Sequence, residues 1–171
     1  MQAIRLSSVS YVVLGLIERV GEATPYDLKR MVALGVGNLW SLQHAQLYTE
    51  PERLAVAGYL TEERETGGRR RKRYRVTRQG RDVLRRWLAE PTAELTELRD
   101  PGLLKLFFGA DPAALAPVQL EAHRRKLAEY EALRAQSPAG DAQAPGPPLA
   151  LEAGIGHERE WIRFWSRLAK G

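Results

Sequence analysis

The sequence of 171 residues contains no cysteine and only three histidines, His44, His123 and His157. The absence of cysteine excludes a disulfide scaffold, thiolate catalysis and iron–sulfur or zinc–thiolate centres. The histidines lie far apart in the sequence, which argues against a histidine-rich metal site. No stretch reaches the roughly 20 apolar residues that a membrane-spanning helix needs, and the first residues hold no long apolar signal core. We therefore expect a cytoplasmic protein with no metal, no cofactor and no membrane association.

The common catalytic motifs are also missing. The sequence has no Walker loop, no dinucleotide-binding glycine pattern and no Gly-x-Ser-x-Gly elbow. The pair His157-Glu158 lacks the second histidine of a metalloprotease helix. These absences predict a protein that is not an enzyme.

Positive charge is concentrated in the first half of the chain. Residues 1–90 carry 16 basic and 10 acidic side chains, whereas residues 91–171 carry 10 and 11. The segment 69–86 alone holds ten basic side chains and one acidic one, Asp82. Arginine outnumbers lysine by 21 to 5, which favours forked contacts to phosphate. This focused charge points to a polyanionic partner, although a charge run is also typical of a solvated surface.

Helical periodicity predicts two short helices in the first 35 residues. The apolar residues Val9, Val13 and Ile17 fall on one face of a helix over residues 9–20, which Gly21 ends. Thr24-Pro25 starts the second helix, because threonine is a favoured N-cap and proline fits the first helical turn.

A third helix is expected over residues 41–57. At 100° per residue, Trp40, Leu47, Pro51 and Leu54 share the side that would be buried. Pro51 removes one helical hydrogen bond, so we expect a kink near it. The opposite side carries small and hydrogen-bonding residues rather than Glu and Lys, which suggests a face that approaches another surface closely.

A β-hairpin follows, with strands at 60–65 and 70–76 and a glycine-containing turn at 66–68. Its basic residues could pair with Glu62, Glu63 and Glu65 across the hairpin. Six basic residues in 69–75 outnumber these three acids, so an excess of positive charge remains at the tip. Thr77 then caps a fourth helix over 78–89, which Pro91 ends.

This order of elements predicts a mainly α fold, a winged helix-turn-helix of three helices plus a two-stranded wing, followed by a helical dimerisation domain. The DNA-binding domain is expected over residues 1–90 and the dimerisation domain over 91–171. The third helix would lie in the major groove of double-stranded DNA, and the wing would contact the backbone or the minor groove. The candidate DNA-binding residues are Ser41, Gln43, His44, Ala45, Gln46, Tyr48, Arg69, Arg70, Arg71, Lys72 and Arg73.

The second half predicts three helices, over residues 98–109, 111–135 and 149–168, with a flexible linker at 136–148 that is rich in proline, alanine and glycine. The first helix would be interrupted near Pro101-Gly102, and Val118 is among the residues expected on the buried side of the second. The helices carry more apolar surface than they can bury alone, so we expect a homodimer; a purely intramolecular core is the alternative. The candidate dimerisation residues are Leu103, Leu106, Phe107, Phe108, Trp161, Phe164 and Trp165.

Several short segments resemble the PadR-like family of bacterial transcriptional regulators. The resemblance rests on Tyr11-Val12-Val13-Leu14-Gly15-Leu16, Thr24-Pro25-Tyr26-Asp27-Leu28, Trp40-Ser41, Ala45-Gln46-Leu47-Tyr48, Arg53-Leu54, Gly58-Tyr59-Leu60, Arg71-Lys72-Arg73-Tyr74-Arg75-Val76-Thr77 and Gly80. In the second half it rests on Leu103-Leu104-Lys105-Leu106-Phe107-Phe108-Gly109 and Gly156-His157-Glu158-Arg159-Glu160-Trp161-Ile162. Pro51 departs from the family, in which an aliphatic residue is more usual.

The resemblance implies a repressor that binds a palindromic operator as a homodimer. In some members of the family, a small aromatic effector releases the repressor from the operator. The candidate stacking residues for such an effector are Trp40, Trp87, Trp161 and Trp165. The alternative is a winged-helix protein-interaction or assembly module without specific DNA readout. The basic wing favours DNA, because a protein-binding module does not need so many cations there.

Overall fold

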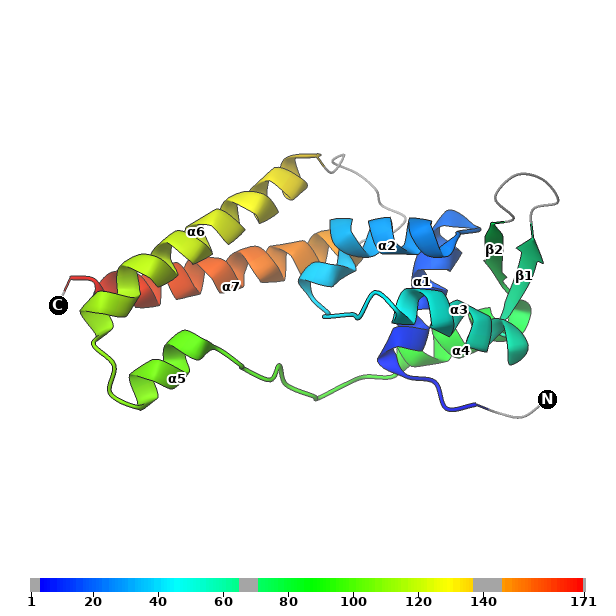
Figure 1. Cartoon of the computed structure of the whole chain (residues 1–171), viewed down its shortest axis with the longest axis horizontal. Coiled ribbons are helices and arrows are strands. Elements are labelled where there is room, and N and C mark those ends of the chain that lie inside the picture. The colour runs from blue at the N-terminus through cyan, green and yellow to red at the C-terminus, as the bar shows by residue number, and fades with distance from the viewer. Residues whose placement is uncertain (1–3, 65–70, 137–145, 171) are drawn as a thin grey trace. The chain divides into compact units, whose positions relative to one another are not determined.

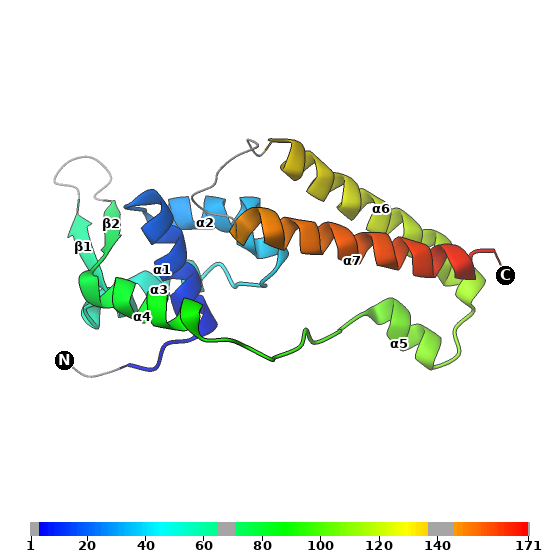
Figure 2. The ribbon, with the colours of Figure 1, turned by 180° about the vertical axis from the view of Figure 1, so that it is seen from behind.

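The structure is a computed structural model, and it describes residues 4–64, 71–136 and 146–170. The chain divides into two compact units, residues 1–94 and 95–171 (Figure 1). Helices α1 to α4 and strands β1 and β2 belong to the first unit, and α5 to α7 belong to the second, as Figure 2 shows from behind. Within the described residues, no helix is both long enough and apolar enough to cross a membrane.

Helices α1, α2 and α4 of the first unit begin at side-chain caps, formed by Ser7, Thr24 and Thr77. The helices of this unit are α1 (Ser8–Val20), α2 (Pro25–Leu34), the short 3-10 helix η1 (Val36–Asn38), α3 (Gln46–Val56) and α4 (Arg78–Ala89). At the start of α2, the Thr24 hydroxyl accepts a bond from the backbone N–H of Asp27, while the Asp27 carboxylate accepts from the N–H of Thr24. Such reciprocal caps satisfy N–H groups that have no partner inside the helix. The predicted α1, α2 and α4 are confirmed.

The wing is an antiparallel pair of β1 (Leu60–Arg64) and β2 (Lys72–Val76), with Leu60 opposite Val76 and Arg64 opposite Lys72. Tyr74 and Val76 point into the core, and Arg73 and Arg75 point the other way, as the strand period of two predicts. Ala23, in the turn between α1 and α2, exchanges two backbone hydrogen bonds with Tyr74, of 3.1 and 2.9 Å. This bridge ties the α1–α2 turn to the wing. The predicted hairpin turn, with Arg69 and Arg70, lies outside the described residues.

The core of the first unit gathers around α1. The side chains of Val13, Leu14, Ile17, Leu28, Leu47, Leu54 and Tyr74 have no exposed surface. Helix α1 packs against α2, α3, α4 and β2, so a single helix supports both the third helix and the wing. The predicted buried residues of α3 are confirmed, except for Trp40, which is half exposed.

Helix α3 starts five residues later than the sequence predicts. Residues 41–43 are irregular and residues 44–45 form a turn, in which the Gln46 side-chain oxygen accepts the Gln43 N–H and the Gln46 N–H bonds the Gln43 carbonyl. Trp40 follows η1 and donates its N–H to the Val36 carbonyl, so it lies outside α3 and is not on the buried face of that helix. Helix α3 continues through Pro51, which is buried, as one helix to Val56.

The second unit contains α5 (Pro101–Phe107), α6 (Pro112–Gln136) and α7 (Gly146–Leu168). Helices α6 and α7 run side by side in opposite directions (Figures 1 and 2). Ala116 and Leu120 of α6 are buried with Trp165 of α7, and side chains of α5 pack against them. This small core holds the three helices together.

Three predictions for the second unit are wrong in detail. Helix α5 begins at Pro101 rather than 98, because the Asp100 carboxylate accepts the N–H groups of Gly102 and Leu103 and fixes the start there. Val118 is exposed rather than buried. The predicted linker is too long at both ends: Gln136 belongs to α6, and residues 146–148 form the first turn of α7, where proline is tolerated. Residues 137–145 lie outside the described residues.

Candidate nucleic-acid interface

The predicted DNA-reading residues gather at the N-terminal end of α3. Ser41, Gln43, His44 and Ala45 are exposed in the segment before the helix, and Gln46 and Tyr48 lie in its first turn. Tyr48 is exposed, whereas Gln46 is half buried and its oxygen is used by the Gln43 N–H at 3.1 Å. The amide NH₂ of Gln46 is therefore the group that can donate to an acceptor outside the protein. In winged-helix proteins the N-terminal residues of this helix contact base edges.

The exposed side of α3 continues beyond the predicted residues. Thr49, Glu52 and Val56 follow Tyr48 on the same face at helical spacing and are exposed. The Thr49 hydroxyl donates to the Ala45 carbonyl at 3.3 Å, which fixes its orientation. Glu52 places a negative charge on this face and bonds to Lys72 of the wing. The candidate set from the sequence omitted Thr49 and Glu52, although the face that predicted the others contains them.

A charged network behind α3 holds it on α1, and nothing in the sequence analysis pointed to it. The Glu50 carboxylate accepts bonds from the Ser10 hydroxyl at 2.6 Å and from two nitrogens of Arg53 at 2.6 and 2.8 Å. Arg53 also donates to the backbone carbonyl of Arg5 at 3.2 Å. Burial acts to raise the pKa of Glu50, but the bonds from Arg53 and Ser10 outweigh it, so the pKa lies below its usual value. The network fixes the side of α3 that faces α1.

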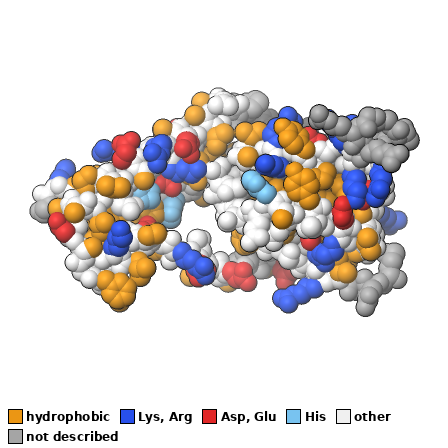
Figure 3. All heavy atoms as spheres, in the orientation of Figure 1, with side chains coloured by type: hydrophobic (Ala, Val, Ile, Leu, Met, Phe, Trp, Pro, Cys, Tyr) orange, Lys and Arg blue, Asp and Glu red, His pale blue; other side chains and the backbone are white. Residues whose placement is uncertain are grey.

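Arg64, Lys72, Arg73 and Arg75 of the wing are paired with acids, some of which lie outside the hairpin. Lys72 bonds Glu52 of α3 and lies 3.5 Å from Glu62, and Arg73 and Arg75 both bond Glu22, which lies before α2. Of the three expected acids, Glu62 pairs with Arg64 and Lys72, whereas Glu63 makes no ion pair within the described part of the chain. Glu65 lies outside the described residues. Arg71 is exposed. Figure 3 shows acidic side chains interspersed with basic ones on this unit.

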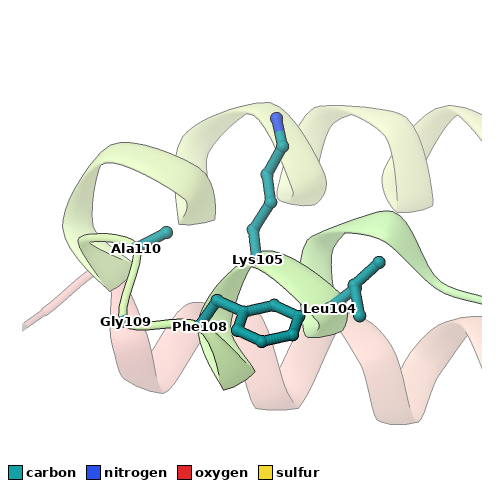
Figure 4. A pocket seen from close by; sticks show the side chains of 5 residues that line it. All are labelled: Leu104, Lys105, Phe108, Gly109 and Ala110. Carbon is teal, nitrogen blue, oxygen red and sulfur yellow. The ribbon is translucent and has the colours of Figure 1, made fainter.

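The candidate dimerisation residues divide into exposed and buried groups. Phe107 and Phe108 are 83% and 79% exposed, and hydrophobic side chains gather over α5 in Figure 3. Leu103, Leu106, Trp161 and Phe164 are partly buried against the core of the second unit. Trp165 has no exposed surface, so it is a core residue and does not lie on the surface of the chain. Next to Phe108, a shallow hollow is lined by Leu104, Lys105, Gly109 and Ala110, with Lys105 pointing away from the ring (Figure 4).

The candidate effector residues lie in different surroundings. Trp87 stacks on Tyr11 with ring centroids 4.6 Å apart, and Trp40 is half exposed before α3. Trp161 stacks on His123 at 5.7 Å and donates its indole N–H to His157 at 2.7 Å. His123 bonds the buried carboxylate of Glu158 at 2.6 Å. His157 lies one helical turn from Trp161 on α7, and the packing of α6 on α7 brings His123, which is far away in the sequence, to the same ring. No group of three metal-binding side chains occurs among the described residues.

Three helices, α1 to α3, with a two-stranded wing and the closing helix α4, joined to a helical second unit, define the class of winged helix-turn-helix regulators. Two family models match the chain, the Transcriptional regulator PadR-like family over residues 13–86 and the Virulence activator alpha C-term over residues 98–170. These matches support a PadR-like transcriptional regulator, a class of proteins that are not enzymes. The family and the fold class predicted from the sequence are therefore confirmed.

The known relatives match almost the whole chain. The Negative transcriptional regulator PadR of Bacillus subtilis (strain 168) is 27% identical over 169 residues, which cover 91% of this chain and 92% of the relative. The crystal structure of Bacillus subtilis PadR with operator DNA matches with a TM-score of 0.84 at 25% identity, covering 96% of this chain and 99% of that one. The crystal structure of the same protein with p-coumaric acid matches with a TM-score of 0.78 at 24% identity, covering 97% and 98%.

Proposed function

We propose that this regulator is a homodimeric repressor that binds a palindromic operator through the first turn of α3 and the segment before it. The observation that carries the proposal is the exposed polar surface of Ser41, Gln43, His44 and Tyr48 beside a basic wing in the same unit. Base edges in the major groove are read by such hydrogen-bonding side chains, and the wing supplies cations for phosphate. The related PadR, solved with operator DNA, supports this assignment. A repressor acting on chromosomal DNA would work in the cytoplasm.

The test separates base reading from general DNA affinity. Footprinting upstream of the chain's own gene identifies the operator, and fluorescence anisotropy then compares this duplex with a random one. Gln46→Ala should weaken operator binding by about 1–3 kcal/mol and leave random-duplex binding nearly unchanged. Gln79→Ala, which removes an exposed glutamine from α4, is the matched control and should change neither. Equal losses of Gln46→Ala on both duplexes would contradict the base-reading role.

The alternative function, a protein-interaction module, predicts a different result. If so, the wild-type protein would bind duplex DNA only through its net charge, and its binding would show no further dependence on salt. Contacts to DNA phosphate would instead make log K fall steeply as log salt rises, and each contact adds about 0.9 to the steepness of this slope. A salt titration of duplex binding therefore separates the two functions.

A small aromatic effector is the third part of the proposal. Of the four candidate tryptophans, Trp161 has the most suitable surroundings, because its ring is partly exposed and lies among the polar side chains of His123, His157 and Glu158. An aromatic side chain with a few polar groups beside it suits a phenolic ligand. The related PadR, solved with p-coumaric acid, supports a ligand of this class. Titration with p-coumaric acid should release the operator from wild type, and Trp161→Phe should require more of the acid.

A further inference from the structure

The carboxylate of Glu22 holds two arginines of the wing at once. Its Oε1 accepts a bond from Arg73 at 2.7 Å, and its Oε2 accepts bonds from Nε and a terminal nitrogen of Arg75 at 2.9 and 2.7 Å. Glu22 precedes Ala23, whose two backbone bonds to Tyr74 place it beside β2. These bonds, Arg75 first and then Arg73, hold the pKa of Glu22 below its usual value. The side chain is therefore charged at neutral pH.

The two arginines have the character of phosphate-binding residues. Their side chains remain 43% and 61% exposed, and both lie on the face of β2 that points away from the core. The neighbouring residue Lys72 bonds Glu52 on the exposed face of α3, so this part of β2 lies beside the proposed DNA-reading helix. Arginine forks bind carboxylate and phosphate with the same geometry. A DNA phosphate and the Glu22 carboxylate would therefore compete for the same donors.

We infer that Glu22 limits the sequence-independent affinity of this regulator by competing with DNA phosphate for Arg73 and Arg75. The inference rests on the proposed DNA-binding function and adds a residue that sets its strength. Exposed ion pairs are weak, so phosphate can displace the carboxylate. Breaking the two pairs costs free energy, and this cost lowers the affinity of every complex with DNA. That cost falls equally on operator and random DNA, because it concerns the backbone and not the bases.

The competing explanation is that the carboxylate only positions the wing. The two explanations predict opposite signs. If Glu22 positions the wing, removal of its charge should misplace the wing and weaken binding to the operator. If it competes with phosphate, removal of its charge should strengthen binding to all duplexes. The Ala23–Tyr74 bridge is made by backbone atoms and does not depend on the carboxylate, so a Glu22→Gln variant should keep the wing in place.

The experiment uses the full chain with Glu22→Gln, after circular dichroism confirms the wild-type fold. Two variants with the same change of charge serve as controls. The first control is Glu63→Gln. Glu63 lies directly opposite Arg73 in the hairpin, and Glu63 makes no ion pair within the described part of the chain. The second control is Glu18→Gln. The Glu18 carboxylate accepts a bond at 2.8 Å from Arg81 of α4, an arginine outside the wing. Affinity for the operator and for a random duplex is measured by anisotropy from about 50 to 200 mM salt, a range over which phosphate-dependent binding weakens steeply.

Glu22→Gln should bind both duplexes roughly 3- to 10-fold more tightly, as expected for releasing two exposed ion pairs. The slope of log K against log salt should steepen by about 1 for each additional phosphate that Arg73 or Arg75 binds once the charge of Glu22 is removed, and the two controls should change much less. Glu22→Asp, which keeps the charge, should stay near wild type. Weaker operator binding by Glu22→Gln, or an increase in affinity equal to that of Glu63→Gln, would overturn the inference. Absence of any duplex binding by the wild type would instead overturn the proposed function, and the inference with it.

Discussion

Two glycines in helices of the first unit should respond to alanine in opposite directions. Gly80 lies in the first turn of α4 and is buried, and a Cβ atom there would lie 2.2 Å from the Tyr59 carbonyl oxygen and 2.8 Å from a methyl group of Val76. Gly15 lies in the middle of α1, and a Cβ atom there would meet nothing within 4 Å. The intrinsic preference of a helix for alanine over glycine is the same at both sites, so the surroundings decide the sign.

The magnitude at Gly80 follows from what must move. Ordinary contacts begin at 3.4 Å, so the Tyr59 carbonyl or α4 must shift by about 1 Å. The same carbonyl accepts the backbone N–H and the hydroxyl of Thr77, the residue that caps α4, at 3.0 and 3.1 Å. A shift would therefore loosen the cap as well. We expect Gly80→Ala to lower the free energy of unfolding by about 3 kcal/mol, and Gly15→Ala to raise it by roughly 0.5–1 kcal/mol.

Thermal unfolding by circular dichroism, at one protein concentration, measures both changes. For a unit of this size each kcal/mol shifts Tm by about 4–8 °C, so Gly80→Ala should lower Tm by about 15 °C and Gly15→Ala should raise it by a few degrees. Wild-type stability in Gly80→Ala would refute the close approach of α4 to Tyr59. A loss of stability in Gly15→Ala would mean that another surface covers this side of α1.

Two further predictions concern the charged network and the proposed dimer. The pKa of Glu50 is lowered in the folded protein, so its contribution to stability is present above its unfolded pKa and is lost as the pH falls through the folded value. Urea midpoints between about pH 6 and pH 3 should therefore fall more steeply for wild type than for Glu50→Gln, and equal slopes would contradict the network. The double change Phe107→Ser and Phe108→Ser should leave the fold intact, because both rings are largely exposed in the chain, and should convert the dimer into a monomer in sedimentation. Val118→Ser, another exposed apolar residue, is the control, and a dimer that survives the double change would place the interface elsewhere.

Local chemistry in the sequence determined most of the helices and the wing. Thr24-Pro25, Thr77 and Gly21 mark helix ends through bonds and dihedral angles within a few residues, so their effect could be predicted without the rest of the fold. The alternation along β2 likewise separated Tyr74 from Arg73 and Arg75. The start of α3 was predicted wrongly although the bond that delays it, from the Gln43 N–H to the Gln46 side chain, is just as local, because glutamine is not one of the residues that usually mark a helix start.

Only the tertiary structure decided which partners the charged and aromatic residues have. The sequence offered Arg73 the acids of its own hairpin, whereas the bridge between Ala23 and Tyr74 gives it Glu22, 51 residues away. The sequence placed Lys72, Arg73 and Arg75 on the second strand of the wing, and their acidic partners follow from this long-range pairing. Trp161 and Trp165 lie one helical turn apart on α7 and carry the same ring, so periodicity could not separate them. The packing of α6 and α5 against one side of α7 buries Trp165 completely and leaves Trp161 partly exposed beside two histidines, because burial depends on neighbours that are distant in the chain.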